Sequence, residues 1–205
     1  MTPDLTTLAR RLRRPRAACR LPGLLVLTDP ERLAEPVAVA ERLPRGSALV
    51  LRHYGAPGRE ALARSLARVC RRRRRLFLVA GDDALALRVG ADGVHWPEGL
   101  VRPRRRRRHG WLVTAAAHGP AALRRAARAG ADAALLSPVF ATASHPLARP
   151  LGSLRFAAWV RRASLPVYAL GGVTNATVHR LAGNGAAGVA VVGAAGATPQ
   201  PKDTA

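Results

Sequence analysis

The chain has 205 residues, of which 48% are apolar, and its formal net charge is +22. This length and apolar content are enough for one well-buried domain, and no apolar run approaches the length of a membrane span. The only cysteines, Cys19 and Cys70, have no metal-like spacing, and the N-terminal residues lack the pattern of a secretory signal. These features predict a reduced, cytoplasmic protein without a membrane partner.

Arginine carries nearly all of the positive charge, since Lys202 is the only lysine. Two arginine runs, 71–75 and 104–108, stand out, but aromatic residues make up only 4% of the chain and none interleave with the runs. Stacking platforms for single strands are therefore not evident. We interpret the runs as solvated helix ends or loops, which makes nucleic acid an unlikely partner, and contact with a polyanion stays open as the alternative.

Short apolar runs predict eight buried strands of a parallel sheet, at 24–28, 48–52, 76–80, 92–95, 112–116, 133–137, 166–170 and 188–192. Stretches rich in alanine, leucine and arginine predict helices at 31–43, 58–73, 83–89, 119–130, 154–163 and 175–183. Three segments, 88–95, 128–137 and 183–193, share one plan in which a helix ends at glycine and a short strand follows. That plan is typical of the junction from a helix to a buried parallel strand.

Eight strands alternating with short helices predict a single (β/α)8 TIM barrel. A doubly wound open sheet is the alternative, because the same alternation would satisfy it. Residues 193–205 lack an apolar stripe and contain two prolines, so we expect the last helix to be weak or truncated. The expected organisation is an arginine-rich segment 1–19, the barrel 20–195 and a flexible tail 196–205.

In such barrels, functional residues gather where the strands end. Gly171 and Gly172 follow the seventh strand, and Gly193 follows the eighth. Glycines there let backbone N–H groups approach an anion, and the expected helix beginning near Asn175 would add more. This pattern predicts a phosphate site. Arg52, at the end of the second strand, has a guanidinium suited to a second phosphate or a pyrophosphate.

Three further strand ends carry titratable side chains. Asp82 either binds magnesium or caps the following helix, and for Asp83 the cap is favoured. His118 follows the fifth strand and is either part of a helix start or an acid–base group. His95 follows the fourth strand, where a structural histidine lining the barrel is as plausible as a functional one.

An ordered set of motifs spans about residues 20–195. It includes LTD at 27–29, GADGVH at 90–95, GADAALLSPVFATASHP at 130–146, LPVYALGGV at 165–173 and GAAGVAVVG at 185–193. Each motif alone is common, but together and in this order they resemble the thiamine phosphate synthase family and its relatives, the TenI-like thiazole tautomerases.

The resemblance implies a TIM barrel that acts on a thiazole phosphate in thiamine biosynthesis. A synthase couples it to a pyrimidine pyrophosphate with Mg²⁺ and releases pyrophosphate, whereas a tautomerase rearranges the thiazole and needs no metal. The implied catalytic residues are His118 and Arg52, and Asp82 is the implied metal ligand. The residues implied to bind substrate are Ser137, Thr142, Ser144, His145, Gly171, Gly172, Val192 and Gly193.

The chain departs from the synthase pattern where pyrophosphate and metal bind. Of the family's Gln-x-Arg-x-Lys after the second strand only Arg52 remains, and Gly81 replaces an asparagine before Asp82. The second metal aspartate falls near Leu100, with Glu98 the nearest carboxylate. Ala116 replaces a serine and His145 a lysine. Losing these groups should weaken stabilisation of the pyrophosphate charge.

Two enzyme activities therefore stay open, coupling and tautomerisation, since His145 and Arg149 could replace lost charges. A second hypothesis is a catalytically impaired paralogue or regulator that binds phosphate ligands without turnover. A third, less favoured hypothesis is a polyanion or nucleic-acid binder driven by the net charge. A homo-oligomer is compatible with the sequence, which does not specify the oligomeric state.

Overall fold

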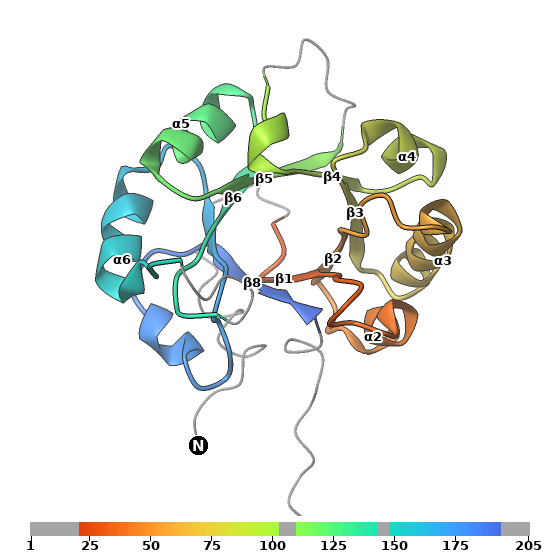
Figure 1. The fold of residues 1–205 in the computed structure, drawn as a ribbon, viewed down its shortest axis with the longest axis horizontal. Helices are drawn as coiled ribbons and strands as arrows, with labels where there is room; N and C mark the ends of the chain where they lie inside the picture. The colour runs from red at the N-terminus through yellow and green to blue at the C-terminus, as the bar shows by residue number, and fades with distance from the viewer. Residues whose placement is uncertain (1–20, 103–109, 143–147, 194–205) are drawn as a thin grey trace, which may run out of the picture.

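A computed structural model describes residues 21–102, 110–142 and 148–193. Its centre is a closed barrel of eight parallel strands in chain order (Figure 1). The strands are β1 (Leu24–Leu27), β2 (Ala48–Leu51), β3 (Leu76–Ala80), β4 (Gly93–Trp96), β5 (Leu112–Ala117), β6 (Ala133–Leu136), β7 (Val167–Ala169) and β8 (Gly188–Val192). Pairing of β1 with β8 closes the barrel, from Leu24 opposite Val189 to Leu27 opposite Val192. The TIM-barrel prediction is confirmed, and the open-sheet alternative is wrong.

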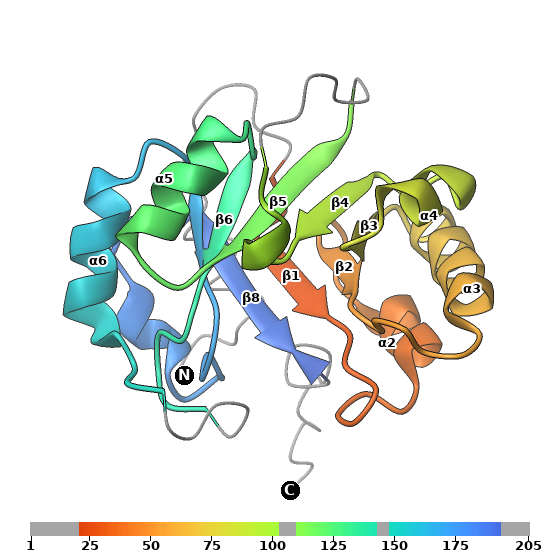
Figure 2. The same cartoon turned by 45° about the horizontal axis from the view of Figure 1, so that its top comes forward.

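Helices surround the strands as an outer ring in Figure 1. They are α2 (Pro36–Arg42), α3 (Arg59–Arg72), α4 (Asp83–Arg88), α5 (Pro120–Arg128) and α6 (Gly152–Arg162), with short 3-10 turns η1 (Glu98–Leu100) and η2 (Val178–Leu181). Figure 2 shows β1 and β8 side by side with their carboxyl ends pointing the same way. All functional strand ends therefore face one rim of the barrel.

The core has two layers because side chains alternate along each strand. Inside the barrel lie Leu25, Val50, Leu78, Leu135 and Tyr168, together with their inward-facing neighbours. The other layer packs between the barrel and the helices. Continuing the inward row past the strand ends leads from Val50 to Arg52 and from Leu135 to Ser137. The alternation thus aims these two residues at the mouth of the barrel.

The helix expected over 175–183 is wrong, since η2 (Val178–Leu181) is the one helical turn between β7 and β8. The Thr177 hydroxyl accepts the Thr174 N–H at 2.9 Å and donates to the Gly172 carbonyl at 2.8 Å. These local bonds offer the backbone an alternative to helical bonds, and the β-branched Thr174, Thr177 and Val178 favour a helix only weakly. No helix N-terminus therefore supports an anion site there.

Helix α2 begins five residues later than predicted, at Pro36 rather than residue 31. Proline at the first helical position is favoured, while the residue before a proline is disfavoured in a helix, so Pro36 fixes the start. The predicted N-terminal segment 1–19, the tail 196–205 and the weak last helix lie outside the described residues, and these domain boundaries stay predictions. Within 21–102, 110–142 and 148–193, no helix is both long and apolar enough to cross a membrane.

Candidate active site

The ends of β1 and β2 are joined by a polar network at the rim. The Arg52 guanidinium pairs with Asp29 at 2.7 Å, and the Arg52 backbone N–H donates to the Thr28 hydroxyl at 3.0 Å. The same hydroxyl lies 2.9 Å from Nδ1 of His53. Burial lowers the pKa of His53, an effect that Asp29 opposes and that Arg59 and Arg52 reinforce. The network holds Arg52 in place at the mouth while His53 stays neutral.

The end of β3 carries Asp82, and both of its carboxylate oxygens have protein partners. Oδ1 accepts the Leu85 N–H at 2.8 Å and so caps α4, while Oδ2 lies 3.3 Å from the Arg59 guanidinium. The cap prediction for Asp83 was wrong, because Asp83 is the first residue of α4 and Asp82 precedes it in extended backbone. Asp82 therefore occupies the N-cap position, from which a side-chain oxygen accepts an N–H group of the first turn.

The inward side chain of β4 is His95, which is buried and lies 2.9 Å from the Thr114 hydroxyl of β5. Burial lowers the pKa of His95 to about 4, and the nearby Arg52 charge adds to that effect. At neutral pH this imidazole is therefore uncharged. Its place inside the barrel fits the structural alternative that the sequence left open.

His118, after β5, forms a pair with a carboxylate. Its Nδ1 lies 2.6 Å from Oε2 of Glu98 in η1, and its backbone N–H donates to the same oxygen at 3.1 Å. Arg125 of α5 holds the other Glu98 oxygen. Burial alone would raise the pKa of Glu98, but His118 and Arg125 together lower it. The His118 side chain is 57% exposed, so Glu98 fixes its orientation while solvent or a substrate can still reach it.

The loops after β6 and β7 approach each other so closely that only glycine fits. A Cβ on Gly171 would lie 2.8 Å from Cα of Pro138, and one on Gly172 would lie 2.3 Å from the Ala141 carbonyl oxygen. Both glycines have positive φ, +88° and +64°. Phe140 donates its backbone N–H to the Gly171 carbonyl at 3.0 Å, which ties the loops together.

Gly193 occupies the corresponding place after β8, next to the loop after β1. Its φ is +76°, and an added Cβ would lie 3.2 Å from the backbone oxygen of Arg32. Val192 pairs with Leu27 at the last register position of β8 with β1. Gly193 thus lies against the loop after β1, as Gly171 and Gly172 lie against the loop after β6.

Most of the residues predicted to be catalytic, to bind substrate or to bind metal lie at this one rim. Arg52, Asp82, Ser137, Gly171, Gly172, Val192 and Gly193 come from five different strand ends. Thr142 is the last described residue before the gap at 143–147 in the loop after β6, and Ser144 and His145 lie outside the described residues. His118 comes from the neighbouring β5 loop and is held by Glu98 rather than by Arg52 or Asp82.

Sequence reasoning missed Arg59, which reaches the end of β3 from the start of α3. It donates to the Ala80 carbonyl at 2.6 Å and pairs with Asp82. Nothing in the sequence singled it out, because arginine is so frequent in this chain. Its position directly after the loop that follows Arg52, at the first residue of α3, was the only available signal.

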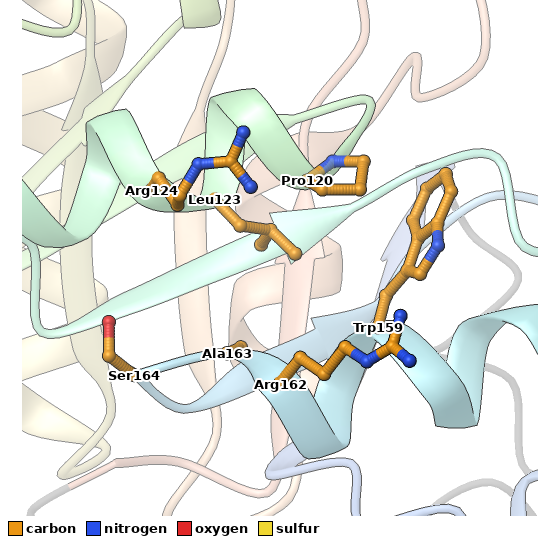
Figure 3. Close-up of a pocket in the computed structure, with 7 residues that line it drawn as sticks. All are labelled: Pro120, Leu123, Arg124, Trp159, Arg162, Ala163 and Ser164. Carbon is orange, nitrogen blue, oxygen red and sulfur yellow. The ribbon is translucent and has the colours of Figure 1, made fainter.

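A separate groove lies between α5 and α6, where Figure 3 shows side chains of both helices around it. Its lining residues are Pro120, Leu123, Arg124, Trp159, Arg162, Ala163 and Ser164. None of the predicted site residues lines this groove. It is therefore distinct from the rim at the strand ends.

Comparison with known proteins matches this arrangement to one family. The family model for thiamine monophosphate synthase matches residues 24–195, which is the whole described barrel. The chain belongs to the thiamine monophosphate synthase family. It is 32% identical over 189 residues to the thiamine-phosphate synthase of Chlorobium phaeobacteroides, covering 88% of this chain and 91% of the relative. With that of Alcanivorax borkumensis it shares 34% over 183 residues, 84% of each.

A solved structure shows the same relationship in three dimensions. The thiamine phosphate pyrophosphorylase from Pyrococcus furiosus superposes with a TM-score of 0.69 at 26% identity, covering 84% of this chain and 86% of that one. The predicted resemblance is confirmed, and the chain is an enzyme of thiamine biosynthesis in this family of transferases. The impaired-regulator and polyanion-binder hypotheses are less well supported.

Proposed function

We propose that this protein is a thiamine phosphate synthase that couples a thiazole phosphate to a pyrimidine pyrophosphate. The family match over the complete barrel is the observation that carries the proposal. Two charged substrates need two anion sites, and the rim offers two groups of residues that suit them. One is the set of glycine loops after β7 and β8, and the other surrounds Arg52 at the end of β2.

The glycine loops suit the thiazole phosphate. Gly171 and Gly172 are partly buried and carry no side chain that could keep an anion from their backbone N–H groups, and Gly193 would add another such group at the end of β8. Loops after strands seven and eight form the usual phosphate site of such barrels. Val192 would contribute from the adjoining strand end, and Ser137, Thr142, Ser144 and His145 belong to the loop that would border the ligand. His145 would replace the lysine of the family pattern.

The guanidinium of Arg52 suits the pyrophosphate. In the coupling, a bond forms between the thiazole and the pyrimidine methylene carbon, and the bond from that carbon to pyrophosphate breaks. The leaving group departs with the electron pair, so negative charge grows on its oxygens. A cation held in advance by Asp29 needs little reorganisation to stabilise that charge.

The family resemblance implies Mg²⁺, but the donors at the end of β3 do not fit a metal well. Asp82 has both oxygens engaged, by the Leu85 N–H and by Arg59. Glu98 is held by His118 and Arg125. Among the described residues no group of three or more His, Cys, Asp or Glu side chains could hold a metal ion. These carboxylates therefore do not form a fitting Mg²⁺ site.

Tautomerisation is the second candidate, and the His118–Glu98 pair favours it. The coupling step needs no proton shuttle from the enzyme, whereas a tautomerase must move a proton between two positions of the thiazole. An exposed histidine oriented by a carboxylate suits that task. For either activity we propose a cytoplasmic location. Burial raises the pKa of the Cys70 thiol to about 12, which is consistent with a reduced cysteine.

The test is product formation from both substrates, followed by chromatography of thiamine phosphate. We expect wild type to form it, and Arg52→Gln to be slower by at least about tenfold, the effect of losing one charge-assisted contact. Arg64→Gln is the matched control, because Arg64 forms an exposed pair with Glu60 on α3. Isomerisation of the thiazole that is lost in His118→Ala, without any coupling, would favour the tautomerase instead.

A further inference from the structure

We propose that Arg59 is a positioning and binding residue of the anion site, where it supplies the positive charge that a divalent cation would otherwise bring to Asp82. Together with Arg52, it would bind a diphosphate group directly. The inference rests on the proposed function for the identity of the natural ligand, but not for the presence of the site.

The contacts of Arg59 place its charge at the end of β3. One terminal nitrogen donates to the Ala80 carbonyl at 2.6 Å and the other lies 3.3 Å from Asp82. The side chain is only 14% exposed, and its guanidinium carbon lies 5.9 Å from the centroid of the Tyr54 ring. A guanidinium so enclosed keeps one position, which a flexible surface arginine does not.

Arg52 and Arg59 belong to one cluster of charge. Both act on His53, lowering its pKa after the larger effect of burial, and both oppose the burial that raises the pKa of Tyr54. The two guanidinium groups therefore flank the same segment, His53–Tyr54. Asp29 and Asp82 are the carboxylates that pair with them, one each.

Arg59 lies where its charge lowers the stability of the fold, so stability does not explain its position. It is the first residue of α3, whose N-cap Gly58 offers no side-chain hydrogen bond. A cation at a helix N-terminus adds to the positive end of the helix dipole. In addition, the Nε atoms of Arg52 and Arg59 are buried without a hydrogen-bond partner in the described part of the chain. Buried donors without acceptors are costly, and an anionic ligand would offset both costs.

The same contacts explain why the metal donors fit poorly. A divalent cation at Asp82 would have to displace the guanidinium of Arg59 from that carboxylate. A diphosphate carries several acceptor oxygens, which two planar guanidinium groups can bind in pairs. This chain thus keeps a positively charged site, although it lacks the lysine, the glutamine and one aspartate of the family pattern.

The experiment is calorimetric titration with inorganic pyrophosphate at moderate salt, in EDTA and separately with MgCl₂. We expect saturable binding in EDTA that MgCl₂ does not tighten. Arg59→Gln should weaken it at least about tenfold, the effect of losing a charge-assisted hydrogen bond. Arg64→Gln, on the same helix but exposed, should bind like wild type, which controls for general charge. Binding that requires MgCl₂, or that is equal in Arg59→Gln and Arg64→Gln, would overturn the proposal.

A second variant keeps the test decisive if Arg59→Gln folds poorly. Asp82→Asn retains the helix cap, since asparagine caps as well as aspartate, but it removes the carboxylate charge. We expect pyrophosphate to bind Asp82→Asn in EDTA at least as tightly as wild type, because Arg59 loses its competing partner. Binding to Asp82→Asn in EDTA that is weaker than binding to wild type would overturn the proposal. Failure to bind thiazole phosphate would count against the proposed function alone, since that ligand tests the glycine loops.

Discussion

Gly172 has a φ of +64°, and an added Cβ would lie 2.3 Å from the backbone oxygen of Ala141. We expect Gly172→Ala to lower the free energy of unfolding by about 2–4 kcal/mol, from left-handed strain plus overpacking, and to weaken thiazole phosphate binding. Urea denaturation measures the first effect. Gly46→Ala is the control, because Gly46 also has positive φ but open space around it, and should cost about 1 kcal/mol. Equal losses in both variants would refute the close approach.

His95 makes stability depend on pH. Its pKa is about 4 in the fold against about 6.5 in an unfolded chain, so the unfolded state binds the proton first as pH falls below 6.5. Stability from this group is complete above pH 6.5 and is lost between pH 6.5 and 4, at about 1.4 kcal/mol per pH unit. From pH 7.5 to pH 5 wild type should lose about 2 kcal/mol more than His95→Asn. Parallel urea midpoints for the two proteins over that range would contradict this.

Residues of the rim could be predicted from the sequence where they directly follow a strand, and could not be predicted where they lie on a helix. Arg52, Gly171 and Gly193 follow strands directly, so their place at the barrel mouth could be predicted. Arg59 reaches the same mouth with its side chain from the first residue of α3, and no local sequence pattern indicates the direction of that side chain. Glu98 was noted only as a carboxylate near a lost metal position, whereas its partners are His118 and Arg125.

At the scale of elements, α4 depends on one cap. Asp82 accepts the Leu85 N–H, while Asp83 lies inside the first turn. Asp82→Ala should therefore lower the free energy of unfolding by about 1 kcal/mol, and Asp83→Ala by less than half as much. Thermal or urea denaturation of the two variants compares them directly. If Asp83→Ala lowered the free energy of unfolding more than Asp82→Ala, Asp83 and not Asp82 would be the residue that caps α4.

The strands could be predicted to within one residue because buried parallel strands are continuous apolar runs that contrast with their surroundings. Strand β3 (Leu76–Ala80) and strand β8 (Gly188–Val192) match their predicted ranges. The segment 175–183 could not be predicted, since alanine and leucine there suggest a helix while Thr177 bonds to local backbone. Such hydrogen bonds depend on how the β7 loop packs, which composition does not reveal.

At the scale of the whole molecule, the net charge of +22 makes the polyanion alternative testable through its salt dependence. Arg72 and Arg73, exposed at the end of α3, pair with Glu41. They precede β3 and therefore lie at the opposite end of the parallel strands from the glycines after β7 and β8. Binding to double-stranded DNA should fall roughly a thousandfold between 50 and 200 mM salt if about six phosphates are contacted. Replacing Arg71, Arg72 and Arg73 by glutamine should flatten that slope, and Arg52→Gln should not. If Arg52→Gln flattened the salt dependence of DNA binding, DNA would contact the rim of the barrel, which would contradict this prediction.

The central claim is that the rim of this barrel binds a thiazole phosphate, and calorimetric titration of the wild-type protein with that compound tests it most directly. At 150 mM salt, with DNA present to occupy the basic surface, we expect one saturable site per chain. Addition of DNA should leave the affinity unchanged, since the arginine run 71–75 precedes β3 and therefore lies at the opposite end of the parallel strands from the glycines that follow β7 and β8. No binding, or binding that DNA abolishes, would contradict the account.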